Sequence, residues 1–384
     1  MRILIIGMNV GRTAGGIVAE RLIHGLSSIH QIDVLTANYN PSLDLSRVCN
    51  IIISKKSFIH PRIHKLLITF FSVELPDYFW GWKSMRLLKS KKFIQYDIVF
   101  SILSYHNYAS LIAGARIARE YNCKYAVHTL DAIPAPGWSE DYIYIKGVKR
   151  LVAKYLSKAD ALFSTNNQML AYQLSTFKYV RNLITNVIYN PSNGEFKEFP
   201  FSKCEADYFV YTGGIYRPRT DKYLLEGFEK LLKLYPDSYL IFVGNYWLPS
   251  SFQNLNQRTL DRIKVLPFTQ ELDPYYSCAT ALIDIDPDVE KDVFLSSKIV
   301  NYIMINRIII SETGKNSPSR NLFKNIDSII QCDHDPDQLF EAMKKSILMK
   351  DKIVFDDRKH VLELFYLDNV IRRLNNSLSK LIMQ

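Results

Sequence analysis

Positively charged side chains follow a glycine turn and open a helical pattern in the second half of the sequence. The turn Gly213-Gly214 is followed by Arg217 and Arg219, and Lys298 stands in the first turn of the later helical pattern. Guanidinium groups form paired hydrogen bonds with phosphate oxygens. A lysine at a helix start opposes the helix dipole, which favours a bound anion there. These residues indicate a phosphate-bearing ligand; the alternative is a solvated basic turn.

Further glycines follow other apolar runs. The first run ends in the turn 7–16, which closes with Gly15-Gly16, and a later run ends in Gly244-Asn245. Glycine lets the backbone approach a ligand, and a helix start attracts an anion. The spacing is not that of a dinucleotide fingerprint, and the run 32–36 has no acid after it to hold a ribose, which argues against NAD. A plain strand-to-helix turn is the alternative at each place.

The elements that must position these residues alternate between short apolar strands and longer helical patterns. Continuous Ile/Val/Leu runs between helices predict parallel sheets that are covered on both faces. We expect strands at 3–6, 32–36, 98–103, 125–128, 161–164 and 187–189, and, after a turn-rich linker, at 208–212, 239–243, 264–266, 280–285, 308–311 and 328–331. The fold class is therefore α/β, with two doubly wound Rossmann-like domains facing a cleft. Their expected bounds are 1–190 and 205–360, and a helix at 361–384 packs back on the first domain.

Together, three stretches resemble the GT-B glycosyltransferases of the retaining, nucleotide-sugar-dependent family 4 type. These are the Gly15-Gly16 loop, the segment 209–245 with its strand, glycine turn, cation and long helix, and the segment 263–314 around Lys298. The resemblance implies transfer of a sugar from a UDP- or GDP-linked donor with retention of configuration. It implies no metal and no enzyme nucleophile, because the acceptor attacks from the side of the leaving group.

The resemblance also assigns roles by position. Arg219 and Lys298 would hold the donor diphosphate as catalytic groups, and Gly15 and Gly16 would face it. The nucleoside would lie near Gly244, Asn245 and Phe268. Asn301 stands where the family usually has a ribose-binding Glu, and it offers one uncharged acceptor oxygen. The family's earlier Glu has only Glu290, Asp292 or Asp288 as substitutes, and its Gly-x-Pro is Asn306-Arg307-Ile308 here.

The acceptor side is expected in the first domain. The segment 128–138 follows an apolar strand, so we expect it to face the cleft. His128 resembles the family's active-site histidine by position, and the resemblance implies a catalytic residue that orients the donor sugar or the acceptor. Asp131 would bind acceptor hydroxyls and Trp138 would stack on a sugar, with His106 as a further acceptor-binding candidate. A buried histidine followed by a proline-rich loop is the alternative.

Residues 51–95 combine cations with aromatic rings. Nine Lys and Arg stand against Glu74 and Asp77, and Phe58, Phe70, Phe71, Phe79, Trp80 and Trp82 are interleaved. Such a mixture suits an anionic membrane surface, where each cation contributes ~1 kcal/mol. We therefore expect a peripheral membrane contact and a lipid-linked or glycan acceptor, and no nucleic acid. A solvated face over core aromatics is the first alternative, and a nucleic-acid surface, which the same mixture could also form, ranks below it.

Composition limits the class of protein. The 384 residues are 48% hydrophobic and 22% charged, which excludes disordered and collagen-like chains. A net charge of +10 favours anionic partners. Five scattered cysteines with no CxxC pair indicate neither zinc nor a disulfide framework, and a cytoplasmic location follows. We expect a glycosyltransferase of cell-surface polysaccharide synthesis. The alternatives are a non-catalytic GT-B-like binding protein and a non-hydrolysing epimerase.

Overall fold

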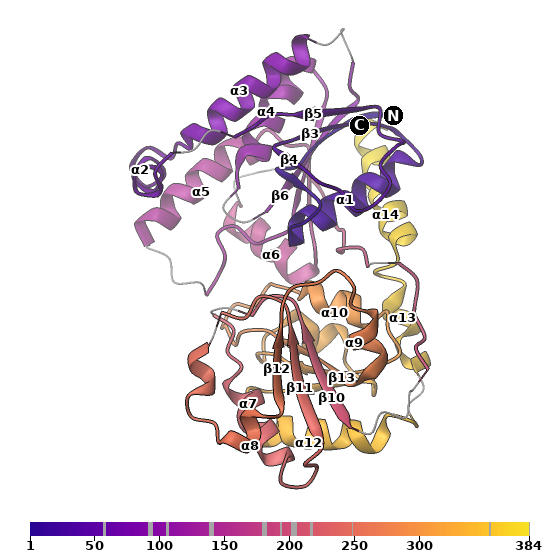
Figure 1. The fold of residues 1–384 in the computed structure, drawn as a ribbon. Coiled ribbons are helices and arrows are strands. Elements are labelled where there is room, and N and C mark those ends of the chain that lie inside the picture. The colour runs from indigo at the N-terminus through magenta and orange to yellow at the C-terminus, as the bar shows by residue number, and fades with distance from the viewer. Residues whose placement is uncertain are drawn as a thin grey trace. The chain divides into compact units, whose positions relative to one another are not determined.

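A computed structural model gives the fold of the chain (Figure 1). It describes residues 1–56, 59–90, 95–104, 107–137, 142–178, 183–192, 194–200, 206–215, 218–247, 249–352 and 355–383. The chain forms two compact units, which we describe one at a time. Unit 1 comprises Met1–Pro191 and Leu367–Gln384, and unit 2 comprises Ser192–Tyr366.

Unit 1 is built on a parallel sheet of seven strands in the order β5-β3-β1-β6-β7-β8-β9. The strands are β1 (Arg2–Ile6), β3 (Gln31–Thr36), β5 (Asn50–Ile53), β6 (Ile98–Leu103), β7 (Lys124–Thr129), β8 (Ala161–Ser164) and β9 (Ile184–Val187). Two short strands, β2 (Asn9–Val10) and β4 (Asn38–Tyr39), pair in parallel and form a separate sheet of their own. The two-residue alternation of β1 divides the core, because Ile3 and Ile5 pack on one side and Leu4 and Ile6 on the other.

Helices cover both faces of this sheet. The helices are α1 (Ala14–Ser27), α2 (Pro61–Leu66), the π-helical turn η1 (Leu67–Phe71), α3 (Leu75–Ser90), α4 (Ala109–Tyr121), α5 (Tyr142–Leu156), α6 (Asn167–Thr176) and α14 (Leu367–Met383). The core with α3, α4 and α5 contains Leu4, and the core with α1 and α14 contains Ile3. The C-terminal α14 lies against α1 so closely that a Cβ on Gly25 would stand 2.3 Å from Ile371.

Unit 2 repeats the design with a parallel sheet of six strands in the order β12-β11-β10-β13-β14-β15. The strands are β10 (Asp207–Thr212), β11 (Ser238–Val243), β12 (Ile263–Leu266), β13 (Ala279–Ile285), β14 (Ile308–Glu312) and β15 (Ile329–Cys332). The helices are α7 (Lys222–Leu231), α8 (Gln257–Leu260), α9 (Asp273–Cys278), α10 (Ser297–Tyr302), α11 (Pro318–Leu322), α12 (Pro336–Met349) and α13 (Lys359–Leu362), with short 3-10 turns at Pro249–Phe252 and Phe355–Arg358.

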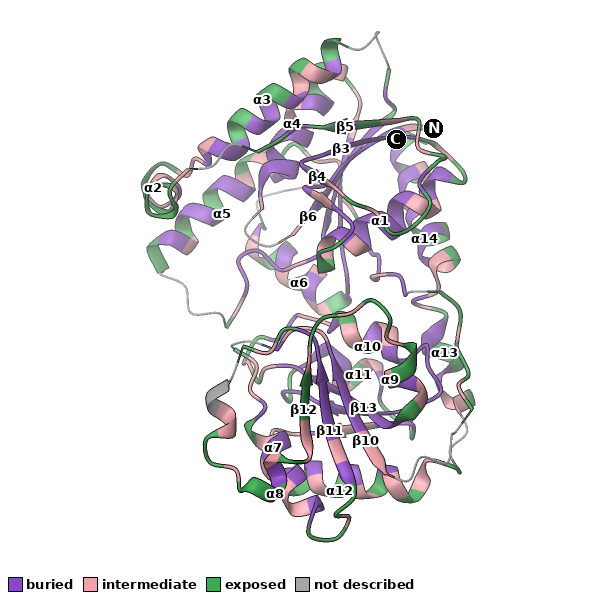
Figure 2. Cartoon of the chain, in the orientation of Figure 1, coloured by how far each residue is buried: buried purple, intermediate pink, exposed green. Residues whose placement is uncertain are grey.

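Burial follows this architecture (Figure 2). The central strands β6 and β13 are buried along their whole length, whereas the edge strands β5, β9 and β12 are only partly buried. Helices thus cover the parallel sheets, which confirms the doubly wound α/β class expected from the continuous apolar runs. The largest exposed apolar side chains of unit 1 gather on α2, η1, the outer face of α3 and the start of α5. Among the described residues, no helix is both long and apolar enough to span a bilayer.

Candidate active site

The carboxyl edge of the unit 2 sheet gathers most of the residues that the sequence singled out. In a parallel sheet all strands end at the same edge, and ligands bind there. Gly213 follows β10, Gly244 follows β11 and Asp286 follows β13. Lys298 lies in α10, which runs between β13 and β14. The topology therefore brings these turns together.

The two glycine turns touch backbone to backbone. Gly213 has a φ of +101° and Gly244 a φ of +138°, both in the region that favours glycine. A Cβ on Gly244 would stand 2.5 Å from the carbonyl oxygen of Gly213, so no side chain fits there. Two neighbouring strands, β10 and β11, therefore end in residues that have no side chain. A ligand can approach the backbone closely at such a place.

Lys298 reaches back over the first of these turns. Its Cε lies 3.2 Å from the point where a Cβ on Gly213 would stand, and its Nζ lies 5.1 Å from the centre of the Tyr211 ring. Ser296 fixes the start of α10, because its hydroxyl accepts the Lys298 N–H at 3.3 Å and donates to Asp284 at 2.6 Å. Asp284 and α10 therefore hold the lysine in place.

Arg219 is fixed from two directions. Its Nε donates to the carbonyl of Ile285 at 3.0 Å, and its Nη2 forms an ion pair with Asp286 at 3.0 Å. The Asp286 carboxylate is buried, while 16% of the Arg219 side chain is exposed. We did not predict Asp286 as a site residue. Its signal is nevertheless present in the sequence, because it directly follows the strand that we expected at 280–285.

Burial shifts the pKa values of this cluster toward neutrality. It lowers the pKa of Lys298 to about 8, and repulsion from Arg219 acts in the same direction. It raises the pKa of Asp284 to about 6, with a further contribution from Asp286, and that of Asp292 to about 7. The cluster thus contains three groups that titrate between pH 6 and 8. The positive charges of Arg219 and Lys298 stand against the carboxylates, so the charges of the cluster nearly cancel. A bound anion would therefore change the net charge of the cluster strongly.

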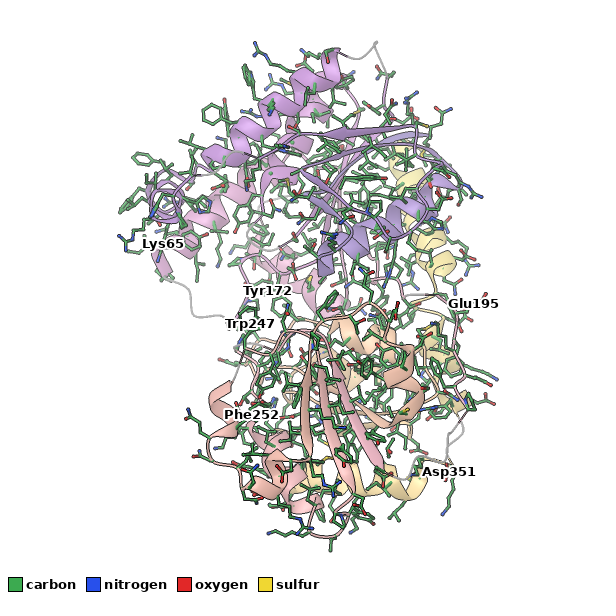
Figure 3. The ribbon with its side chains drawn as sticks, viewed as in Figure 1. Lys65, Tyr172, Glu195, Trp247, Phe252 and Asp351 are labelled. Atoms are coloured by element: carbon green, nitrogen blue, oxygen red, sulfur yellow. The ribbon has the colours of Figure 1, made fainter. Side chains whose placement is uncertain are left out.

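A pocket of about 490 Å³ lies in unit 2 next to α10. Asn301, one turn after Lys298, lines it together with Tyr276 and the segment 270–274. Its rim includes Glu195, which is labelled in Figure 3, and the ion pair between Lys197 and Asp273. The volume is within the range of small-molecule sites. Asn301 therefore contributes to a pocket, although its amide also donates to Ser297 at 3.3 Å.

The remaining unit 2 candidates lie at the same sheet edge. Asn245 is exposed, and its backbone oxygen accepts from Ile215 at 3.0 Å. Phe268 comes two residues after β12 and is 60% exposed. Of the three carboxylates proposed to replace the family's glutamate, only Asp292 is buried. Burial raises its pKa, and the charge of Arg219 partly offsets that rise. Asp288 and Glu290 are exposed.

In unit 1 the glycine loop forms a capped helix start. The N–H of Gly16 donates to the Thr13 hydroxyl at 3.0 Å, which caps α1. A Cβ on Gly15 would stand 3.5 Å from both Leu130 and Ser104, so Gly15 lies against the ends of β6 and β7. Both glycines are therefore at the carboxyl edge of the unit 1 sheet, where a ligand was expected.

The expectation that His128 faces a cleft is wrong. The strand β7 continues through Thr129, which leaves His128 inside the sheet and fully buried. Its ring stacks on Phe100, and its Nε2 lies 3.2 Å from the carbonyl of Ile188. Burial lowers its pKa to about 4, so the ring is neutral at physiological pH. Since a fully buried ring cannot reach a substrate, we withdraw its catalytic assignment.

Asp131, and not His128, lies beyond the carboxyl end of β7, where we expected a side chain that faces a ligand. It comes two residues after β7, and burial raises its pKa to about 6. It remains the acceptor-side candidate of unit 1. His106 and Trp138, as well as Arg217 in unit 2, lie outside the described residues.

Within the part of the chain that the structure describes, no group of three or more His, Cys, Asp or Glu side chains is arranged to hold a metal ion.

Comparison with known proteins identifies the fold. No protein-family model matches the sequence, and no curated protein matches it by sequence. Among solved structures, HepE from Anabaena in complex with UDP and glucose has a TM-score of 0.70 at 11% identity and covers 99% of both chains. The lipopolysaccharide outer core galactosyltransferase WaaB has a TM-score of 0.63 at 14% identity, with 99% of both chains covered. A proposed UDP-N-acetylglucosamine 2-epimerase from Listeria monocytogenes has a TM-score of 0.58 at 10% identity over 99% of this chain and 96% of that one.

The chain therefore has the GT-B fold, with a Rossmann-like sheet in each unit. Transferases and the proposed epimerase share this fold, so its activity has to be argued from the site.

Proposed function

We propose that the protein is a glycosyltransferase that moves a sugar from a nucleotide sugar to an acceptor. The observation that carries the proposal is the placement of Arg219 and Lys298 beside two bare glycine turns at the carboxyl edge of the unit 2 sheet. Loss of a nucleoside diphosphate leaves negative charge on the leaving group. Two preorganised cations in a poorly solvated site stabilise that charge, and they could do so without a divalent ion.

Carboxylate oxygens beside these cations match the hydroxyls of a donor sugar. Among the described residues, one oxygen each of Asp284, Asp286 and Asp292 is buried without a hydrogen-bond partner. Sugar hydroxyls donate to such acceptors, and an unpartnered buried carboxylate is costly. A donor whose diphosphate meets Arg219 and Lys298 would supply both the anion and the hydroxyl donors that this cluster lacks. The neighbouring pocket at Asn301 would then hold the ribose, and the base would lie toward Gly244, Asn245 and Phe268.

The donor base is proposed as uracil or guanine. The relative HepE was solved with UDP and with UDP-glucose, so UDP is the first nucleotide to test. Retention of configuration is part of the proposal and rests on the resemblance of the Lys298 segment. Under that mechanism the acceptor oxygen attacks from the side of the departing diphosphate, so no enzyme nucleophile is needed.

The acceptor is proposed as a glycan or lipid-linked saccharide in cell-surface polysaccharide synthesis at the cytoplasmic face of a membrane. The supporting surface is the apolar tip of unit 1, which we define as Ile63, Leu66, Phe70, Phe71, Tyr142 and Ile143. These side chains are between 52% and 78% exposed. Isolated exposed apolar residues are ordinary, but a contiguous group indicates a contact surface.

Two cations of α2 lie beside this apolar tip. The exposed Arg62 and Lys65 come from α2, and Lys65 is labelled at this end of unit 1 in Figure 3. The acids Glu74 and Asp77 are buried and pair with His64 and Lys56. The start of α5 also contributes to the tip, since η1 packs against Gly147. One expectation for the segment 51–95 is corrected: Trp80, expected among the surface aromatics, is buried, and its ring nitrogen donates to the carbonyl of Ser54.

The deciding experiment combines binding with transfer. Purified protein is titrated with UDP, GDP and ADP in a thermal-shift assay, because a ligand of the folded state raises apparent stability. The preferred nucleotide sugar is then supplied with membrane lipid extract, and the product sugar is analysed. Binding without turnover would favour a non-catalytic GT-B-like protein, which the uncharged Asn301 and the paired Arg219 make the second candidate. An isomerised free donor would indicate an epimerase instead.

A further inference from the structure

A second cavity lies in unit 1, in a groove between α3, α4 and α5. It has a volume of about 670 Å³. Its walls carry Tyr78 from α3, Arg116 and Arg119 from α4, Lys154 and Tyr155 from α5, and Lys158 just after α5. The cations lie toward the C-terminal ends of α4 and α5, whereas Gly15 and Asp131 follow the carboxyl ends of the strands. The groove therefore belongs to neither sheet edge discussed above.

The groove is positively charged without internal compensation. No carboxylate side chain lines it, and none of its four cations forms an ion pair with a described residue. A cation in the last turn of a helix is favoured by the helix dipole. This accounts for Arg119 on α4 and Lys154 on α5. Arg116, one turn earlier on α4, and Lys158, two residues after α5, line the same groove and need another explanation.

The positive charge of the groove affects the pKa of Tyr78. The Arg116 guanidinium lies 3.7 Å from the centre of its ring. A hydrogen bond from Arg116 and then its charge lower the pKa of the Tyr78 phenol below its ordinary value, and Lys154 adds to this effect. Cations from α4 and α5 therefore act on one point of the groove, as they would on the charge of a ligand.

An apolar pocket of about 250 Å³ adjoins the groove through shared walls. Tyr78, Lys154 and Tyr155 line both cavities. The other walls of the smaller one include Leu75, Phe79, Ile112 and Leu151. Glu74 also lines it, but its carboxylate pairs with His64 and Lys56. A cationic groove thus continues into an apolar pocket.

The apolar pocket opens beside the apolar tip. Ser72 and Val73 line it, and they directly follow Phe70 and Phe71 at the end of η1. These two phenylalanines are 66% and 70% exposed. An amphiphile leaving a membrane at the tip would meet the apolar pocket first and the cations of the groove beyond it.

We propose that this groove binds one anionic phospholipid, with its phosphate among Arg116, Arg119, Lys154 and Lys158 and part of an acyl chain in the apolar pocket. The proposal goes beyond the transferase function, because it assigns unit 1 a lipid site separate from donor and acceptor. A charged headgroup joined to an apolar chain matches both cavities, whereas a free phosphate would use only the groove. The bound lipid would hold the protein on membranes rich in anionic lipid.

The test uses a lipid that is soluble as a monomer. Dihexanoylphosphatidylglycerol, below its micelle concentration, is titrated into the full chain by calorimetry. Dihexanoylphosphatidylcholine and chain-free glycerophosphoglycerol are titrated in parallel. We expect one site for the anionic lipid, and binding by each of the other two weaker by about tenfold or more. Equal affinity for the chain-free headgroup would overturn the acyl-chain assignment, and equal affinity for phosphatidylcholine would overturn the role of charge.

The variant pair separates this groove from general electrostatics. Arg119→Ala with Lys158→Ala removes two exposed groove cations, and Arg47→Ala with Lys233→Ala removes two exposed cations elsewhere. The groove variant should bind the anionic lipid about tenfold more weakly, while the control binds it as the native protein does. Equal losses in both would overturn the site. Lys154→Ala is the substitute should the double variant not fold. Because UDP binding is measured on the same samples, failure of the donor site is distinguished from failure of the groove.

Discussion

The guanidinium of Arg219 forms an ion pair with Asp286 at 3.0 Å, at the end of the strand where a phosphate is expected. The pair keeps Arg219 in place, because the Ile285 carbonyl holds its Nε at the same time. It also competes with any ligand phosphate for the guanidinium. A ligand must therefore share Arg219 with a buried carboxylate, so the two residues should affect nucleotide affinity in opposite directions.

Replacing each partner tests this competition. Arg219→Ala should weaken binding of the preferred nucleoside diphosphate by about tenfold or more, because a charge-assisted hydrogen bond is lost. Asp286→Asn keeps the shape and removes the competing charge, so it should tighten binding about threefold. Calorimetric titration of both variants measures the effect. Weaker binding in both would mean that Asp286 serves to orient Arg219 and does not compete with the ligand.

Lys298 should make nucleotide binding depend on pH. Its pKa is lowered to about 8, so the ammonium loses its proton as the pH rises through that value. A neutral amine does not attract a diphosphate, and affinity should therefore fall between pH 7 and pH 9. In Lys298→Arg the side chain stays charged over this range, and the fall should disappear. Lys222→Ala, which removes an exposed lysine nearby, should retain it. A fall that persists in Lys298→Arg would assign the titration to another group.

The close contact between the two glycine turns should be visible in the free energy of unfolding of glycine variants. Gly244 and Gly194 share a φ of +138°, but only at Gly244 would a Cβ meet another atom, 2.5 Å away on Gly213. Gly194→Ala should cost about 1 kcal/mol of unfolding free energy from backbone strain alone. Gly244→Ala should cost about 3 kcal/mol, because strain and overlap add. Urea unfolding compares the two. Equal costs would show that the turns separate without penalty.

Much of the fold follows from the sequence because its strands are continuous apolar runs. Eleven of the twelve expected strands agree with the structure to within one or two residues; the exception, expected at 187–189, lies at Ile184–Val187. We did not predict α3, α5, α6 or α12. In α3 the buried face includes Gly81, which packs on Ala113, and Asp77, so its apolar pattern is broken. Tertiary contacts, not local periodicity, define that helix.

The site could be predicted where backbone chemistry leaves a mark in the sequence. Gly244 and Lys298 stand out because a glycine after a strand and a lysine at a helix start are unusual. Asp286 directly follows a predicted strand, which marks it as a candidate, but its pairing with Arg219 is recognised only once the two are close in space. His128 was misplaced because its strand is one residue longer than the apolar run suggests. A one-residue shift at a strand end decides between a buried and an exposed side chain.

The buried His128 should make the folded state sensitive to acid. Its pKa is lowered from an ordinary 6.5 to about 4 by burial, so below pH 6.5 the unfolded chain takes up a proton that the folded chain does not. Stability from this group is therefore lost as the pH falls, by about 3 kcal/mol between the two pKa values. His128→Leu should be less stable at pH 7 and should lack this loss.

Asp131, Asp284 and Asp292 have raised pKa values and act in the opposite direction, but they are present in both proteins. Urea unfolding at pH 4.5 and pH 7 therefore isolates the histidine, and equal pH dependence in both proteins would show that it is charged in the core.

The apolar tip of unit 1 should govern attachment to membranes. Phe70 and Phe71 are 66% and 70% exposed, and inserting a phenyl ring into a bilayer is favourable by about 2 kcal/mol. The double variant Phe70→Ser with Phe71→Ser should therefore partition onto vesicles of phosphatidylglycerol and phosphatidylcholine more weakly than the native protein, by more than tenfold in order of magnitude, roughly as two lost phenyl rings predict. Leu234→Ser, which removes an apolar side chain that is 60% exposed on unit 2, is the control and should change nothing.

Sedimentation of protein with vesicles, at rising salt, separates the two contributions to this attachment. Salt screens the cations Arg62 and Lys65 but leaves ring insertion intact. The native protein should therefore retain part of its binding at high salt, and the phenylalanine variant should lose all of it. If the variant and the native protein respond to salt in the same way, the exposed rings do not enter the bilayer, and the attraction is electrostatic alone. Nucleotide affinity, measured in solution, should be the same in both proteins, because the two rings lie in unit 1 and Arg219 and Lys298 lie in unit 2.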